Sequence, residues 1–426
     1  MTATMRIGVF SDTHIGRCIP KAIGELRRQA YRHAFTQAID IFTREEIDCL
    51  IHAGDLFEKR SMTPQESVFV KDELQRLVDS IRDAHAKDVM MFAIRGNHDG
   101  TPENNSLDFI KHPLAEYLKI IGDKTLQGEG EAEVHNGLFL SGVAYHPYIS
   151  RKFEEIKPTI KRGFEHESRL KILLVHNFIK GHHQIPPGVP LHNCLDVEDL
   201  KDLKVDLIVA GHHHNRKETE IGNGAVLLTP GATEAIDLSD EGSYGVYILE
   251  GKNSPRFVPI KPLHEIHNIR VDSRETTKPA EWFVDKATEE IGTYAHSAQA
   301  RDAEAVLRVL LLGLTDEDPF EIERSLTSRL GKMRGRLSKI LHFELVNRVE
   351  DMRRQVIPMT VNRARVTSEI LTLLGNMSQD AAEIVEGVSM TLDERASQTT
   401  GLLTASDRLP FVKRWMNILE KVEATG

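Results

Sequence analysis

The stretch "VDLIVAGHHHN", residues 205–215, joins a short apolar run to three consecutive histidines. The run is typical of a buried strand, and Gly211 marks its end. In extended backbone, side chains two residues apart point the same way, so His212 and His214 are expected to share a cleft while His213 points elsewhere. Three histidines alone do not establish a metal site, and further donors are needed from other parts of the chain.

Short apolar runs of this kind recur from residue 5 to about residue 260 and alternate with helical patterns. The runs are "RIGVF", "CLIHAG", "VMMFAIRG", "LFLSGVAY", "KILLVHN", "LIVAGHH", "AVLLTPG" and "YGVYILE". The segments "IGELRRQAYRHAFTQAIDIFTREE" and "PQESVFVKDELQRLVDSIRDAHA" have the apolar spacing of amphipathic helices. The fold class is therefore α/β (α+β). The runs "VLLTPG" and "YGVYILE", separated by "SDEGS", are expected to form a hairpin, which predicts mixed rather than purely parallel pairing.

Side chains that bind metals follow five of these predicted strands. They lie in the motifs "SDTH", "GD", "GNHD", "VHN" and "GHHH". The carboxyl ends of strands in an open α/β sheet converge on one crevice, so the five loops are expected to meet. A pair of divalent ions accepts a mixture of imidazole and oxygen ligands. The motifs supply such a set: Asp12, His14, Asp55, Asn97, His176, His212 and His214.

The signal lies in the combination of the motifs. A lone Gly-Asp is ordinary turn chemistry. Five motifs in this order resemble the calcineurin-like metallophosphoesterase superfamily, whose pattern is D-x-H, G-D, G-N-H-D/E, H and G-H-x-H. The resemblance covers about residues 5 to 250 and implies a two-sheet sandwich flanked by helices. It also implies that Asp12, His14 and His214 hold one ion, that Asn97, His176 and His212 hold the other, and that Asp55 bridges them.

Finer features resemble one branch of that superfamily. The stretches "HAGDLFEKRSMTP", "AIRGNHD" and "LLTPGATEAIDLSDEGSYGVYILEG" are similar to those of the SbcD-type repair exonucleases, the family of the meiotic-recombination-eleven nuclease. The resemblance implies a manganese-dependent exonuclease and single-strand endonuclease that processes DNA ends in double-strand-break repair. It also implies DNA, an SMC-like ATPase of the SbcC or Rad-fifty kind and a second copy of the chain as partners. Three domains are expected: a nuclease domain at 5–262, a DNA-binding cap at 263–349 and a helical ATPase-binding segment at 350–426.

Within the cap, the pattern predicts a helix in "AEWFVDKATEEIGTYA", a strand in "AVLRVLLLGL", a helix in "PFEIERSLTSRLGKM" and a strand in "ILHFELVNR". In the last segment, "PFVKRWMNILEKVE" carries one apolar helical stripe. That stripe either binds the partner or packs on the cap. The residues proposed for the partner are Val412, Trp415, Met416 and Leu419.

Two residues, His98 and Asp99, are expected to have roles in catalysis rather than in metal binding. His98 is not needed as a ligand, so it is available to donate a proton to the leaving group. Asp99 is expected to orient the His98 ring, with a helix N-cap as the alternative role.

Arg95 is a candidate phosphate contact, with a structural ion pair as the alternative. The basic residues Lys332, Arg334 and Arg336 are further DNA-binding candidates.

Composition limits the remaining choices. The net charge is −10 for 426 residues, so no general basic surface favours nucleic acid. Three scattered cysteines argue against disulfides, and no long apolar segment predicts secretion or membrane insertion. A cytoplasmic, nucleoid-associated location is expected. A phosphomonoesterase or cyclic-nucleotide phosphodiesterase, and a non-catalytic scaffold, remain the alternative functions.

Overall fold

The structure, a computed structural model, describes residues 5–354 except 112, 113, 115, 166, 187, 223, 241 and 252–254. The apolar stripe containing Trp415 therefore lies outside the described residues. Most of the described chain belongs to one compact unit, Met1–Val349. None of the helices in the described part is long and apolar enough to cross a membrane.

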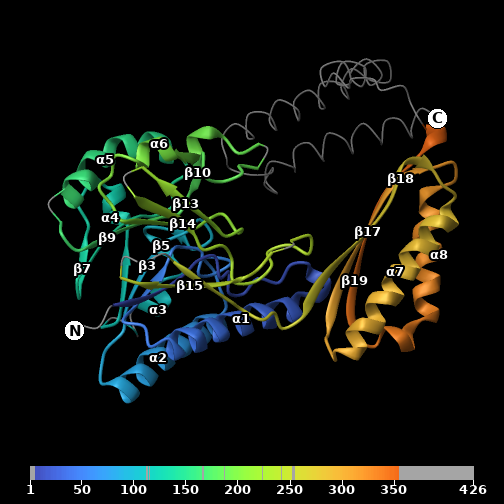
Figure 1. The fold of residues 1–426 in the computed structure, drawn as a ribbon, viewed down its shortest axis with the longest axis horizontal. Helices are drawn as coiled ribbons and strands as arrows, with labels where there is room; N and C mark the ends of the chain where they lie inside the picture. The colour runs from blue at the N-terminus through green and yellow to red at the C-terminus, as the bar shows by residue number, and fades with distance from the viewer. Residues whose placement is uncertain are drawn as a thin grey trace, which may run out of the picture. The chain divides into compact units, whose positions relative to one another are not determined.

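Two six-stranded sheets pack face to face (Figure 1), which confirms the expected sandwich. The first sheet has the order β16 (Arg256–Pro259), β15 (Gly245–Glu250), β1 (Arg6–Phe10), β2 (Cys49–His52), β3 (Met90–Ile94) and β6 (Leu118–Ile121). The second has the order β13 (Lys217–Ile221), β14 (Ala225–Thr229), β12 (Leu207–Ala210), β9 (Leu170–Val175), β8 (Leu138–Val143) and β7 (Glu133–His135).

The core lies in three apolar layers that follow the strand patterns. Strand residues from the two inner faces, such as Ile51 and Leu174, pack together between the sheets. Helices α1 (Gly24–Arg44) and α2 (Pro64–His85) cover the outer face of the first sheet, while α5 (Ile149–Glu165) and α6 (Val197–Leu200) cover that of the second (Figure 1). Because the strands are covered on both faces, they read as nearly continuous apolar runs.

The direction of the strands decides where their ends lie. β1, β2, β3 and β6 pair in parallel, and so do β8, β9, β12 and β14. Each set therefore delivers its carboxyl ends to a single edge of its sheet. The loops that carry all five motifs begin at these ends.

The expected hairpin between "VLLTPG" and "YGVYILE" is wrong. The first run is β14 of the second sheet, and the other is β15, which pairs antiparallel with β1 in the first. The connecting segment is held across the sandwich by α1: Arg27 donates to Glu234 and Tyr31 donates to the carbonyl of Ala235. These contacts are far apart in sequence, so local turn residues gave no sign of them.

A separate sheet of three strands follows the sandwich. Its order is β17 (Glu265–Thr277), β18 (Ala305–Thr315) and β19 (Ile340–Asp351), with α7 (Ala280–Ala300) and α8 (Pro319–Lys332) packed on it. The expected succession of helix, strand, helix and strand is confirmed. The domain boundaries, and the DNA-binding role of this part, stay predictions.

Candidate metal centre

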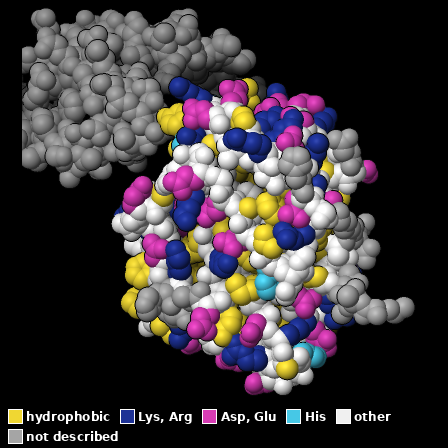
Figure 2. All heavy atoms as spheres, turned by 90° about the vertical axis from the view of Figure 1, so that its left-hand side faces the viewer, with side chains coloured by type: hydrophobic (Ala, Val, Ile, Leu, Met, Phe, Trp, Pro, Cys, Tyr) yellow, Lys and Arg dark blue, Asp and Glu magenta, His cyan; other side chains and the backbone are white. Residues whose placement is uncertain are grey.

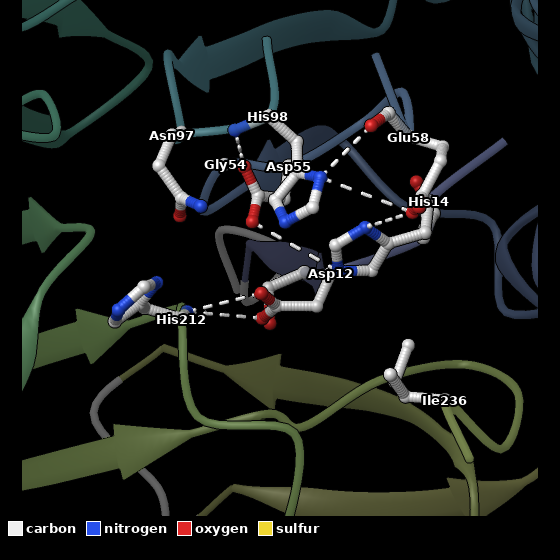
Figure 3. A network of polar contacts seen from close by, with 12 residues as sticks. Asp12, His14, Gly54, Asp55, Glu58, Asn97, His98, His212 and Ile236 are labelled. Atoms are coloured by element: carbon white, nitrogen blue, oxygen red, sulfur yellow. Dashed lines mark hydrogen bonds and ion pairs between the residues drawn. The ribbon is translucent and has the colours of Figure 1, made fainter. Parts of the chain in front are cut away.

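The motif loops meet between the two sheets. Asp12 and His14 follow β1, Asp55 follows β2, and Asn97 follows β3. From the second sheet, His176 follows β9, and His212 and His214 follow β12. Figure 3 shows Asp12, Asp55 and His14 facing one another across this junction.

One group of donors consists of Asp12, His14 and His214. Each offers one ligand atom, and these atoms lie within 4.8 Å of one another. Asp12 is completely buried, and both of its carboxylate oxygens accept from the amide of His212, at 3.0 and 3.2 Å. This group can hold one cation.

A second group, with the same spacing, consists of Asp55, His176 and His212. His176 Nδ1 lies 2.7 Å from the carbonyl oxygen of Ala53, which can only accept, so Nδ1 carries a proton and Nε2 is the ligating atom. The Asn97 side-chain oxygen lies 3.3 Å from this Nε2. Asn97 therefore lies beside a donor of the second group, while its role as a metal ligand stays a prediction.

Asp55 lies between the two groups. Its Oδ1 accepts from the amide of His98 at 2.8 Å, which fixes the carboxylate. Its Oδ2 lies 3.2 Å from His176 Nε2 and 3.9 Å from His14 Nε2 (Figure 3 shows the His14 contact). One carboxylate oxygen therefore faces a histidine of each group, although its role as a bridge between ions stays a prediction.

The backbone at the centre is strained. Asp12, His14, Asp55 and His212 have φ values of 50°, 41°, 55° and 76°. Residues with a Cβ rarely adopt this left-handed region, and such strain concentrates at functional sites. The strained turns aim four side chains inward. No signal in the sequence indicated this.

Gly96 allows the close approach of the first-sheet loops. A Cβ at this position would lie 2.1 Å from Oδ1 of Asp55 and 2.4 Å from its backbone nitrogen. No side chain can occupy that space without displacing the carboxylate. The glycine of the "GNHD" motif is therefore required by packing.

Charge coupling sets the protonation states of the donors. Burial would raise the pKa of Asp55, but the charge of His176 and its hydrogen bond hold the pKa well below its usual range. Burial, with the charge of His176, lowers the pKa of His212 to about 3. Burial would also lower the pKa of His176, but Asp55 outweighs it and raises the pKa to about 9. Asp55 is thus ionised and His212 neutral, the states that ligation requires.

The donors fit divalent cations. Nε2 of His14 is buried and has no hydrogen-bond partner among the described residues, an arrangement that is costly unless another group binds there. Carboxylate, imidazole and amide donors together suit borderline ions such as Mn²⁺ or Zn²⁺. The chain therefore has clusters of side chains that could bind metal ions.

Sequence reasoning missed Glu58. Its Oε2 lies 3.2 Å from His14 Nδ1, its Oε1 accepts from Arg17 at 2.9 Å, and its backbone carbonyl lies 2.8 Å from His98 Nδ1 (Figure 3). Glu58 thus holds a donor of the first group and the expected proton donor at once. It lies three residues after Asp55, but no pattern singled it out, because surface loops commonly carry glutamate.

The expected role of Asp99 is wrong. Its carboxylate does not contact the His98 ring, whose Nδ1 partner is the Glu58 carbonyl. Instead it is completely buried and accepts from the amides of Asp55, Phe57 and Gly96 and from the Ser106 hydroxyl. It ties the "GD" loop to the "GNHD" loop. It is not a helix N-cap either.

The alternation expected for the three histidines is right in outcome but wrong in cause. His213 turns away from the metal groups and stacks on His183, with ring centroids 4.6 Å apart. His212 and His214, however, belong to different groups, and His212 has the left-handed φ of 76°. The side chains of His212 and His214 therefore point to different groups because of a strained turn at His212, and not because the backbone is extended.

The candidate DNA-binding residues fall outside the cluster. Arg95 is buried and donates to Asp123 at 2.9 Å and to the carbonyls of Gly100 and Tyr145, which corresponds to the structural ion pair. Lys332, Arg334 and Arg336 lie exposed at the end of α8 and in the turn after it. On the face seen in Figure 2, positive and negative side chains are interspersed, and no broad basic field marks a DNA path there.

The family and the relatives that this chain matches are consistent with a metal centre at this site. Residues 5–216 match the calcineurin-like phosphoesterase family. The "DNA double-strand break repair protein Mre11" of Methanosarcina acetivorans is 27% identical over 292 residues, 66% of this chain and 42% of that protein. The protein of the same name from Sulfolobus acidocaldarius is 26% identical over 238 residues, which cover 54% of this chain and 55% of that protein.

A bacterial relative is also similar. The "uncharacterized metallophosphoesterase YhaO" of Bacillus subtilis is 22% identical over 258 residues, 60% of this chain and 57% of that protein. The chain spans about half the length of the relatives it matches.

Proposed function

Because residues 5–216 are a calcineurin-like metallophosphoesterase domain, we propose that the chain is a DNA nuclease that uses two divalent metal ions, with Mn²⁺ as the ion. The observation that carries the proposal is the place of Asp55 between the two donor groups. The similarity to proteins named for DNA double-strand break repair supports DNA as the substrate.

Two cations would be held by the chain's own donors. Asp12, His14 and His214 would hold one, Asn97, His176 and His212 the other, and Asp55 both. When bound, such ions supply Lewis-acid chemistry that polarises a phosphoryl oxygen and stabilises the charge developing on it.

His98 would supply the proton for the leaving oxygen. Its Nδ1 faces the carbonyl of Glu58 at 2.8 Å and must carry a proton, because a carbonyl oxygen only accepts. Nε2 is then the atom that can transfer a proton. His98 is 35% exposed in its side chain, compared with 1% for His14, so substrate can reach it. A fixed ring with one accessible nitrogen suits general-acid catalysis.

Glu58 would position both histidines. Its carboxylate lies 3.9 Å from His98 Nδ1 as well as 3.2 Å from His14 Nδ1, so one side chain lies beside both rings. Arg17 holds the other carboxylate oxygen. Glu58 thus takes the orienting role that the sequence had suggested for Asp99.

Three further features of the proposal concern partners. DNA would be processed together with an SMC-like ATPase, bound through the segment that contains Val412, Trp415, Met416 and Leu419, and the active form would be a homodimer. Lys332, Arg334 and Arg336 would contact the DNA backbone. The similarity to proteins named for DNA double-strand break repair supports this setting.

The test compares four substrates with purified full-length protein and Mn²⁺. They are linear DNA, hairpin DNA, bis-p-nitrophenyl phosphate and a phosphomonoester. The proposal expects cleavage of both DNAs and of the phosphodiester. Hydrolysis of the phosphomonoester alone would favour a phosphatase, and no hydrolysis of any substrate would favour a scaffold.

A further inference from the structure

An exposed aromatic stack lies beside the metal centre. The ring of Tyr148 stacks on that of His192, with centroids 5.0 Å apart and planes inclined by 18°. Tyr148 is 50% exposed, and the neighbouring Leu191 is 67% exposed. These side chains do not belong to the apolar core of the described residues, so packing in the core does not explain why the two rings stack.

The stack forms one wall of an open cleft of about 620 Å³. Its lining residues are His146, Tyr148, Arg151, Lys152, Glu155 and His192. Positive charge prevails, because two cations face one carboxylate. The Arg151 side chain is 87% exposed, and its Nε lies as far as 3.9 Å from the nearest oxygen of Glu155. Its guanidinium is therefore accessible to solvent and to a ligand.

The N-terminus of helix α5 adds to the positive charge near the cleft. α5 begins at Ile149, directly after Tyr148, and runs for 17 residues. Amides in the first turn of a helix carry partial positive charge and favour anions. The cleft therefore combines a flat aromatic surface with groups that attract phosphate.

The cleft is joined rigidly to the metal centre. Asn177, the buried residue after His176, donates to the backbone carbonyls of His146 at 3.1 Å and of Asn193 at 3.3 Å. Its side-chain oxygen also accepts from the His146 amide at 3.4 Å. One side chain thus ties the loop that carries Tyr148 to the loop that carries His192. A donor of the metal centre is its immediate neighbour in the chain.

A second connection runs through Tyr145. Its ring centroid lies 5.6 Å from that of His212 and 6.4 Å from that of His176. Tyr148 comes three positions after Tyr145, a span of at most about 10 Å of chain. The loop that carries the stack therefore also lines the metal centre, through Tyr145.

We propose that the cleft between Tyr148, His192 and Arg151 is a subsite for an unpaired nucleobase of single-stranded DNA. The inference rests on the proposed function for its ligand. Bases stack on aromatic side chains without regard to sequence, and arginine pairs with the flanking phosphate. In a duplex the bases are already stacked on one another, so the subsite favours single strands, ends and loops.

The test measures binding apart from hydrolysis. Fluorescence anisotropy in EDTA gives the dissociation constant of full-length protein for a labelled oligo-dT and for an oligonucleotide of the same length made of abasic units. Tyr148→Ala and His192→Ala should each weaken oligo-dT binding about tenfold. Binding of the abasic strand should not change. Tyr148→Phe, which keeps the ring, should bind like the unmodified chain.

Two controls separate the possible outcomes. Arg169→Ala removes an exposed arginine outside the cleft and should change neither constant, whereas Arg151→Ala should weaken both strands equally. Hydrolysis of bis-p-nitrophenyl phosphate, which has no base, should be the same in the Tyr148→Ala variant as in the unmodified chain.

The inference is overturned if Tyr148→Ala leaves oligo-dT binding unchanged or weakens both strands alike. If either of these results is accompanied by the loss of a protein that co-purifies with the unmodified chain, the stack is a protein-docking surface instead. If oligo-dT binding depends on Tyr148 but no DNA is cleaved with Mn²⁺, the subsite stands and the proposed nuclease function fails.

Discussion

Oδ2 of Asp55 lies 3.2 Å from Nε2 of His176, and both side chains are buried. The first residue comes from the loop after β2 of the first sheet and the second from the loop after β9 of the other. The contact therefore joins the two halves of the sandwich at the point where the candidate ligands meet. Its strength depends on charge, since Asp55 raises the pKa of His176 to about 9 against the effect of burial. A cation that replaces the proton of His176 can be held at the same place.

Replacement of His98 should separate catalysis from metal binding. In His98→Ala we expect hydrolysis of bis-p-nitrophenyl phosphate to fall about a hundredfold to ten-thousandfold, because a general acid is lost. Metal content by elemental analysis should stay unchanged. His213→Ala, which alters a histidine stacked outside the metal groups, is the matched control and should keep full activity. Loss of an ion from the His98 variant would make His98 a ligand.

Glu58→Gln tests the positioning role of Glu58. The amide keeps the size of the side chain but removes the charge behind His14 and His98, and we expect activity to fall by about 10- to 100-fold. The loss should appear in kcat rather than in KM, with the melting temperature of the unmodified chain. Glu45→Gln, which changes a glutamate paired with Arg256 on the surface, should have no effect. Equal kcat values in the Glu58 variant and the unmodified chain would rule the role out.

Asp99→Asn should act through stability. An asparagine amide cannot accept all the hydrogen bonds of the carboxylate, and each buried donor left unpaired costs about 1–3 kcal/mol. We expect denaturant unfolding to show a loss of that order, which Asp88→Asn, on an exposed side chain, should not show. Unchanged stability with lost turnover would instead indicate a direct role in catalysis.

Removal of residues 350–426 should leave the phosphoesterase activity intact. Met1–Val349 is a compact unit, so the shortened chain should fold and hydrolyse bis-p-nitrophenyl phosphate with Mn²⁺. Co-purification with an SMC-like ATPase should be lost, and Trp415→Ala in the full chain should weaken it. A shortened chain that still binds the ATPase at full affinity, or that unfolds, would contradict the proposed partner segment.

The sequence predicted the features that depend on local pattern. Apolar runs predicted the strands, and the motif at each strand end predicted candidate donors that lie close together, because parallel strands bring their ends to one edge. It failed where a long-range contact decides. The segment that crosses from β14 to β15 is held by Arg27 and Tyr31 of α1. The role of Glu58 depends on the position of the His98 ring, whose Nδ1 faces the Glu58 carbonyl.

Local rules also failed for backbone strain. Aspartate adopts the left-handed region more often than most residues, but propensity alone does not place Asp12 and Asp55 there, with φ values of 50° and 55°. Such conformations persist only when surrounding contacts enforce them. In this fold the amide of Asp55 is held by Asp99 at 2.9 Å, and that of Asp12 by the Gly54 carbonyl at 3.0 Å. The geometry of the centre is thus a property of the folded loops.

The most direct test of the two-metal account is an anomalous-difference map from crystals of the full chain soaked in Mn²⁺, with data collected at the manganese absorption edge. The account predicts two peaks, one among Asp12, His14 and His214 and the other among Asn97, His176 and His212. Both should contact the Asp55 carboxylate, and the same soak of Asp55→Ala crystals should weaken or remove them. A single peak, or two peaks of which one does not contact Asp55, would contradict the account.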